Sequence, residues 1–185
     1  MFPWRVSGAG VVFTTTFRRE LCLVFGREKN KTKKVGYDLY EDFGGGIDKG
    51  ETIKQAAIRE CYEETLGCIM ERSMLLERIK KCDDSCILNS TTPRGMPCHT
   101  YVIEVPYRKY YTVSFHKTRD FLQSLNVKSY ALQEMVDVKW VCARSMFTKI
   151  RKQWEKYGML TDQVEWNKLM SIAKYEYIEP DTWRR

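Results

Sequence analysis

The sequence predicts a mixed α/β fold in a single domain. Apolar and β-branched runs precede and follow one strongly patterned central helix, more helical spacing comes late in the chain, and no repeat or Pro/Ser-rich linker divides the 185 residues. A chain of this length buries roughly 70 % of the surface that it exposes when unfolded, so it needs no disulfide or metal merely to fold. We therefore expect one domain over residues 1–185, with a helical extension over about 146–185.

The strands are expected in order at 8–16, 20–26, 36–43, 74–80, 98–106 and 135–142, where β-branched or apolar residues gather. The basic stretch before residue 36 is expected to be a hairpin loop. The three glycines at 44–46 are expected to end the strand at 36–43. Helical spacing occurs at 117–125, 146–157 and 162–175. The two late helices are expected to pack in the core or in a homodimer, with a lid over the substrate as the alternative.

Composition excludes several classes of protein. Apolar residues make up 43 % and charged residues 30 % of the chain, which excludes a mostly disordered or collagen-like protein. No apolar run approaches the ~18–20 residues of a membrane span, and the first residues lack the order of a secretory signal. Seven cysteines are an odd number and cannot all pair internally. We therefore expect reduced thiols, a cytoplasmic location and no membrane partner.

The formal net charge of +7 is unevenly distributed. Residues 27–34 (REKNKTKK) carry five positive charges and one negative, and residues 144–156 carry five against one Glu. Such runs are typical of solvated surfaces, and they also attract polyanions such as nucleic acid, polyphosphate or an anionic membrane. Composition leaves these alternatives open.

The central helix has clear signals at both ends. Thr52, followed three residues later by Gln55, fits a capping box, so the helix is expected to begin at Ile53. Gly67 is a suitable residue for the position just after a helix, so the helix is expected to end near Leu66.

One side of this helix, about 120° wide, carries both apolar and acidic residues: Ile53, Ala56, Ala57, Glu60, Glu63 and Glu64. The other side carries Ile58, Cys61, Tyr62 and Leu66, so packing on both sides is expected. Three carboxylates three and four residues apart repel one another. If that side is partly buried, a hard divalent cation such as Mg²⁺ can compensate for the repulsion. The alternative is an acidic face in water or one neutralised by Lys and Arg.

The residues around these acids fit a longer pattern. Glu51 follows Gly45 after five residues, and seven more lead to Arg59-Glu60-x-x-Glu63-Glu64. This spacing resembles the Nudix box of the Nudix hydrolases, G-x5-E-x7-R-E-U-x-E-E-x-G-U. The sequence departs from it at two points. One extra residue stands before Gly67, and Phe43 stands where many members have proline.

The resemblance implies an α/β/α sandwich with a mixed sheet, and Mg²⁺- or Mn²⁺-dependent hydrolysis of a diphosphate linkage. Its metal ligands would be Glu60, Glu63 and Glu64, with the backbone of Gly45 nearby. Arg59 would hold these carboxylates by ion pairing and Glu51 would support Arg59, while Gly44 and Gly46 would let the backbone approach the phosphates. In the family the general base is sometimes a box glutamate and sometimes a carboxylate on a later loop; for the latter Glu134 is preferred here, with Glu104 and Asp137 as alternatives.

The basic loop bears on the substrate. Lys31, Lys33 and Lys34 precede the strand that leads to the box, so they could reach a bound polyphosphate. Capped RNA, a dinucleoside polyphosphate and a diphosphoinositol polyphosphate all suit a basic site. A small nucleotide sugar or ADP-ribose-type substrate is one alternative, and a Nudix-fold protein that binds RNA or nucleotide without turnover is another.

The cysteines offer a competing metal site. Cys82, Cys86, Cys98 and His99 provide four potential zinc ligands within 18 residues. The last two are adjacent, which is poor spacing for tetrahedral zinc. Free thiols, and no zinc, are expected instead.

Overall fold

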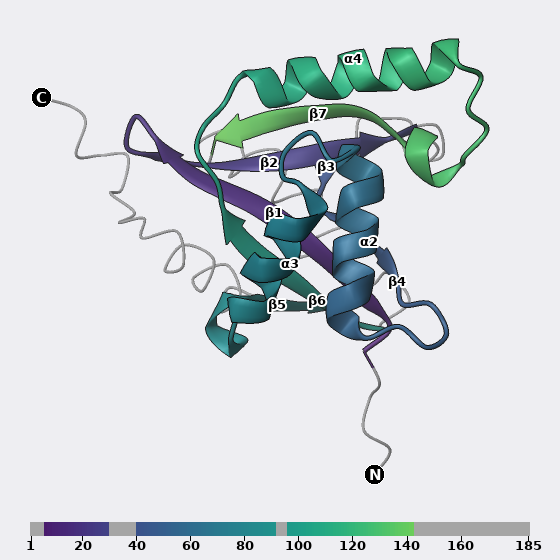
Figure 1. Ribbon diagram of the computed structural model, residues 1–185. Helices are drawn as coiled ribbons and strands as arrows, with labels where there is room; N and C mark the ends of the chain where they lie inside the picture. Colours follow the sequence, from purple (N-terminus) through teal and green to yellow (C-terminus); the bar gives the residue numbers. More distant parts are fainter. Residues whose placement is uncertain (1–5, 30–39, 92–95, 143–185) are drawn as a thin grey trace, which may run out of the picture.

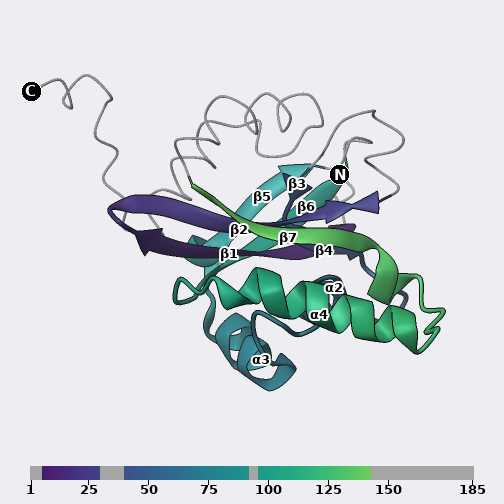
Figure 2. The same ribbon diagram turned by 90° about the horizontal axis from the view of Figure 1, so that it is seen from above.

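The computed structural model describes residues 6–29, 40–91 and 96–142. Within these residues a seven-stranded mixed sheet forms the centre of the molecule. Helices α2 (Ile53–Thr65), α3 (Arg72–Lys81) and α4 (Tyr110–Ser124) lie together against one face of the sheet (Figures 1 and 2). Of the predicted α/β/α sandwich, the mixed sheet and its packing against helices are confirmed, and the described residues show one helical layer. No helix among the described residues is long and apolar enough to cross a membrane.

The sheet is built around its two longest strands, which form a hairpin. β1 (Gly8–Phe17) pairs antiparallel with β2 (Glu20–Glu28) through a two-residue turn, and parallel with β6 (Pro97–Glu104). The shorter strands complete it: β3 (Tyr40–Glu41) and β7 (Met135–Cys142) pair with β2, β4 (Phe43–Gly46) pairs with β1, and β5 (Ile87–Thr91) pairs with β6. Two short 3₁₀ turns, η1 (Asp84–Cys86) and η2 (Ala131–Gln133), precede β5 and β7.

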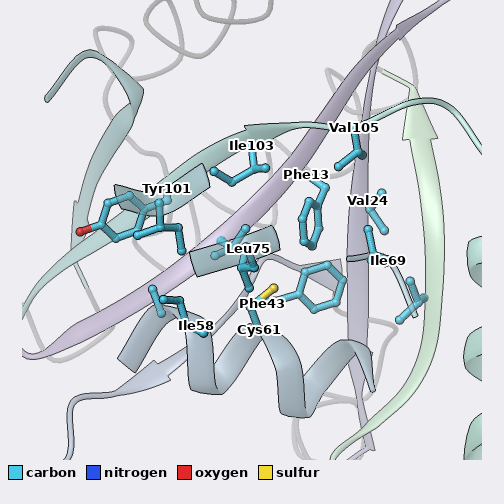
Figure 3. Packing of buried hydrophobic residues seen from close by; sticks show 14 of the residues in the cluster. Phe13, Val24, Phe43, Ile58, Cys61, Ile69, Leu75, Tyr101, Ile103 and Val105 are labelled. Atoms are coloured by element: carbon cyan, nitrogen blue, oxygen red, sulfur yellow. The ribbon is translucent and has the colours of Figure 1, made fainter. Parts of the chain in front are cut away.

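The core lies between this sheet and the helices (Figure 3). Phe13 of β1 and Phe43 of β4 are fully buried with ring centroids 6.0 Å apart, and Ile58 and Cys61 of α2 pack in the same cluster. The apolar side of α2 is thereby fixed against β1 and β4. This contact sets where the acidic residues of α2 lie.

Four predicted strands and the central helix are confirmed, but the strand expected at 74–80 is wrong. These residues belong to α3, in which Leu75 and Ile79, four residues apart, are buried while their neighbours are exposed. Burial every fourth residue is the period of a helix. The helix expected at 117–125 begins earlier, at Tyr110, and strand β5 was not predicted.

The segment at 36–46 also differs from expectation. Gly44–Gly46 do not end a strand but form part of β4, which pairs with β1. Of the strand expected at 36–43, only residues 40–43 lie among those described. The helices expected at 146–157 and 162–175, and the lysines of the basic loop, lie outside the described residues.

Candidate active site

Helix α2 carries the acids, and local interactions fix both of its ends. The backbone N–H of Gln55 donates to Thr52 Oγ1 (3.2 Å), and that of Thr52 donates to Gln55 Oε1 (2.9 Å), which confirms the capping box. The helix ends at Thr65, followed by two left-handed residues, Leu66 (φ 54°) and Gly67 (φ 65°). Its start is thereby fixed relative to the loop from β4, the segment that carries the first part of the motif.

Arg59 is the centre of the site. Its Nε and Nη2 atoms each donate a 2.9 Å hydrogen bond to Glu51, one to each carboxylate oxygen. Its Nη1 lies 2.8 Å from Glu60 Oε1 and 3.5 Å from Glu63 Oε2. Nη2 also donates to the carbonyl of Gly46 at 3.0 Å. One guanidinium therefore joins the loop after β4 to two acids of α2, with the paired geometry that makes Arg–carboxylate contacts strong and directional.

The pKa values of Glu51, Arg59 and Glu60 are shifted in different directions or for different reasons. The hydrogen bonds from Arg59 lower the pKa of Glu51, and those contacts raise the pKa of Arg59 further above its already high value. The pKa of Glu60 is raised, mainly because burial disfavours its charged form, and the negative charges of Glu63 and Asp48 add to this. Glu60 is thus a carboxylate whose charge is only partly compensated, even though Arg59 is in contact with it.

Gly45 lies directly against Glu60. A Cβ placed on Gly45 would lie 2.5 Å from Glu60 Oε1, closer than side-chain atoms approach. A Cβ on Gly44 would meet the backbone of Gly10 at 2.6 Å, whereas one on Gly46 would meet nothing within 4 Å. The absence of a side chain at Gly45 is what allows the β4 backbone to approach the carboxylate.

The third acid, Glu64, is 5 % exposed and lies on the buried side of α2. The predicted packing on both sides of the helix holds for Ala56, Ala57, Ile58 and Cys61, which are buried, but not for Tyr62, which is 40 % exposed. Solvent exposure thus increases from Glu64 through Glu60 to Glu63.

The site fits a hard divalent cation by the chemistry of its donors. Glu60, Glu63 and Glu64 supply carboxylate oxygens, and the β4 backbone at Gly45 reaches one of these carboxylates. Oxygen donors of this kind suit Mg²⁺. In the described residues no group of three or more His, Cys, Asp and Glu side chains has the arrangement of a metal site. The Nη1 atom of Arg59 contacts one oxygen each of Glu60 and Glu63.

The three predicted base candidates lie in different surroundings. Glu134 directly precedes β7 and follows η2, which packs against α2. Asp137 accepts a hydrogen bond from Tyr40 Oη (2.8 Å) and lies 3.0 Å from His116 Nε2. These contacts engage both oxygens of Asp137.

Glu104 is further away along the sheet. It lies five residues beyond His99, which is level with Ala9 and hence with Gly45 in the sheet. Five residues of strand correspond to about 16 Å at roughly 3.3 Å per residue.

A hollow of about 260 Å³ opens beside Gly45. It is lined by Ser7–Gly10, Glu41, Asp42, Gly44–Gly46, Ser90, Thr91, Cys98 and Thr100. Thr100 Oγ1 donates a 2.7 Å hydrogen bond to Asp42 Oδ2 across the strands. Sequence reasoning missed Asp42 and Thr100, since they are 58 residues apart and belong to no motif.

Six cysteines in the described part of the chain are free thiols: Cys22, Cys61, Cys68, Cys82, Cys86 and Cys98. Burial is the main cause that raises the pKa of Cys82 to about 11, and neighbouring Cys86 adds to it. At neutral pH this thiol is protonated in the metal-free protein.

Comparison with known proteins places this geometry in context. The family model described as NUDIX domain matches residues 4–163. A comparison with curated proteins finds no match. Solved structures similar to this chain include the NUDIX domain of Shewanella oneidensis NrtR with ADP ribose, at 14 % identity and a TM-score of 0.48, covering 92 % of this chain and 89 % of that one. A C. elegans Ap4A hydrolase binary complex shows 16 % identity and a TM-score of 0.49, covering 92 % and 97 %.

Proposed function

The chain belongs to the NUDIX domain family and is a hydrolase of pyrophosphate bonds, and from this premise we propose that it is Mg²⁺-dependent and acts on a phosphate-rich substrate. The observation that carries the proposal is the contact of Arg59 with Glu51, Glu60 and Glu63. It supports a site in which acids on one helix are held ready to receive a cation. A binding protein without turnover would not require all of these groups together.

In this proposal Glu60, Glu63 and Glu64 hold the cation, which when bound neutralises phosphate oxygens and lowers the pKa of water. Arg59 orients Glu60 and Glu63, and Glu51 in turn fixes the guanidinium plane. Catalysis of this kind depends mostly on positioning and electrostatics.

The proton of the attacking water needs an acceptor, and we assign this role to the carboxylate of Glu134. Its backbone lies beside η2, which packs on α2, and it directly precedes β7. Glu104 is too far along the sheet from the level of Gly45.

The substrate class follows from charge. The net charge of +7 and the lysines at 31, 33 and 34 favour a polyanion: capped RNA, a dinucleoside polyphosphate or a diphosphoinositol polyphosphate. The hollow beside Gly45 offers space for the group attached to the diphosphate. A screen of these substrates and of sugar nucleotides for phosphate release with Mg²⁺ tests the assignment. Turnover of sugar nucleotides alone would refute the preference for polyanions.

Variants then test the acids themselves. Glu63→Gln or Glu64→Gln removes a charged ligand with little change of size, and each should lower kcat by roughly 10²–10³-fold, the scale of one lost electrostatic group. Glu77→Gln on the exposed side of α3 makes the same change of charge away from the site and should leave kcat unaltered. Full activity of the double Glu63→Gln/Glu64→Gln variant at saturating Mg²⁺ would contradict the proposal.

A further inference from the structure

The end of the sheet away from the acids carries a row of aromatic rings. The rings of Phe17 and Tyr107 stack with centroids 3.9 Å apart and planes 12° apart. Tyr107 is 5.1 Å from Trp140, and Trp140 is 6.1 Å from Tyr111. Trp140 Nε1 donates a 3.0 Å hydrogen bond to the carbonyl of Arg108, which fixes the row against the segment before α4. We call Phe17, Tyr107 and Trp140 the aromatic row; Tyr111, which is 5 % exposed, belongs to the core beneath it.

Four exposed cations surround this row: Arg18, Arg19, Arg108 and Lys109. The guanidinium of Arg18 lies over the ring of Phe17, 5.3 Å from its centroid. Helix α4 begins at Tyr110, so the positive end of its dipole points to the same region. Glu20 and Glu104 are the acids beside it. Among the described residues none of the four cations forms a salt bridge, so their charge is available to an anion.

The turn that presents two of these cations is strained. Arg18 and Arg19 form the two-residue turn between β1 and β2 with φ values of 52° and 62°. Such turns favour Asn-Gly, because left-handed backbone is unfavourable for other side chains. Strain retained at an exposed position points to a function for the side chains.

A second hollow, of about 450 Å³, adjoins the row. The cations Arg78 and Arg108 and the acids Glu71 and Glu104 line it, together with Tyr110, Tyr111 and apolar residues such as Ile69. Its wall therefore combines charges of both signs with apolar and aromatic surface. A nucleobase, which has a flat apolar face and polar edges, is a ligand of that chemistry.

We propose that this surface, the aromatic row with its four cations, binds single-stranded RNA and holds the body of a capped-RNA substrate. Single-strand sites elsewhere combine aromatic stacking platforms with cations along the backbone. The inference rests on the capped-RNA form of the proposed function.

The spacing of the two sites suits one RNA strand. Ala9 is level with Gly45, and Phe17 lies eight residues further along β1, about 26 Å at roughly 3.3 Å per residue. That distance corresponds to about eight nucleotides at the ~3.4 Å spacing of a stacked strand. An RNA of about a dozen nucleotides can therefore occupy both sites, and a capped dinucleotide cannot.

Binding of an uncapped, fluorescently labelled 12-nucleotide RNA in the presence of EDTA tests the proposal without any hydrolysis. Substitution of all four cations by Gln should weaken the affinity by roughly 10–100-fold. It should also reduce the slope of log K against log salt by up to about 2.8, or 0.7 per lost phosphate contact. A matched control loses the same charge from exposed lysines elsewhere: Lys80, Lys81, Lys117 and Lys128. It should change the affinity less than threefold.

Length dependence provides the second measurement. The four-cation variant should raise KM for a capped 12-nucleotide RNA and leave KM for a capped dinucleotide unchanged. Equal loss of affinity in the control variant, or no loss in either, would overturn the proposal. So would a dimer that dissociates only in the four-cation variant, because the surface would then be a contact between two copies. If no capped RNA is hydrolysed but RNA still binds through the four cations, the docking surface stands and the capped-RNA substrate fails.

Discussion

The three consecutive glycines of β4 provide a sharp test of the site, because a methyl group added at each meets a different neighbour. At Gly45 the new Cβ would lie 2.5 Å from Glu60 Oε1, whereas ordinary contact begins near 3.4 Å. The carboxylate of Glu60 must therefore retreat by about 0.9 Å. Because Glu60 is the flexible end of a side chain, the fold can accommodate this, but a proposed metal ligand is displaced. A misplacement of ~1 Å can cost about 100-fold in rate.

We therefore expect Gly45→Ala to lower kcat by about 100-fold with little change in Tm. Gly46→Ala, whose Cβ meets nothing within 4 Å, should retain wild-type Tm and should lower kcat far less than Gly45→Ala does. Gly44→Ala should lower stability instead, since its Cβ meets the backbone of Gly10 and Ala9 at 2.6 and 2.8 Å. Overpacking of this kind costs about 1–3 kcal/mol, and each kcal/mol lowers Tm by ~2–4 °C in a chain of this size.

The assays are phosphate release on the best substrate of the screen, thermal unfolding, and titration of Mn²⁺ by electron paramagnetic resonance. The last measurement reports the metal site independently of turnover, and it should show weaker binding in Gly45→Ala alone. Wild-type kcat and Mn²⁺ affinity in Gly45→Ala would refute the role of Glu60 as a ligand. Equal losses in Gly45→Ala and Gly46→Ala would refute the contact with Glu60 as their cause.

Three further predictions follow from other contacts. Arg59→Lys keeps the charge but loses the paired hydrogen bonds to its acids, so kcat should fall at least about tenfold, measured at several Mg²⁺ concentrations. The pKa of Glu60 is raised in the folded protein, so folding favours its protonated form. The stability that this form contributes is fully present below the pKa of the unfolded chain and is lost as pH rises through the folded pKa. Glu60→Gln should therefore raise the Tm of the metal-free protein at neutral pH and flatten this loss, and a Tm series across pH that matches wild type would contradict it. Replacement of Arg18-Arg19 by Asn-Gly should relieve the strained turn and raise stability by about 1 kcal/mol or more, and a lower Tm would show that the turn is not strained.

The central helix could be predicted from the sequence because its determinants are local. The capping box of Thr52 and Gln55 and the left-handed Gly67 each act within a few residues of a helix end. The resemblance to the Nudix box likewise implied that Glu51 supports Arg59, and the structure shows two hydrogen bonds between them. The roles proposed for these residues in catalysis remain predictions.

Other features could not be predicted because they depend on tertiary packing or on ambiguous patterns. The short apolar run in α3 fits a strand as well as a helix, and only burial of Leu75 and Ile79 identifies its period. Strand β5 carries polar residues and forms through its pairing with β6. The stack of Phe17 on Tyr107 joins residues 90 positions apart, so no sequence pattern predicts the aromatic row.

The acids of α2 lie close together although their negative charges repel one another. One guanidinium contacts four carboxylates, those of Asp48, Glu51, Glu60 and Glu63. Two of its donors are committed to Glu51, whose pKa falls, while the pKa of Glu60 remains raised by burial. The fold thus uses Arg59 to fix the geometry of the cluster without neutralising it. The remaining negative charge faces the β4 backbone at Gly45. We propose that this partial compensation gives the cluster affinity for a divalent cation, where full compensation would make it a closed structural ion pair.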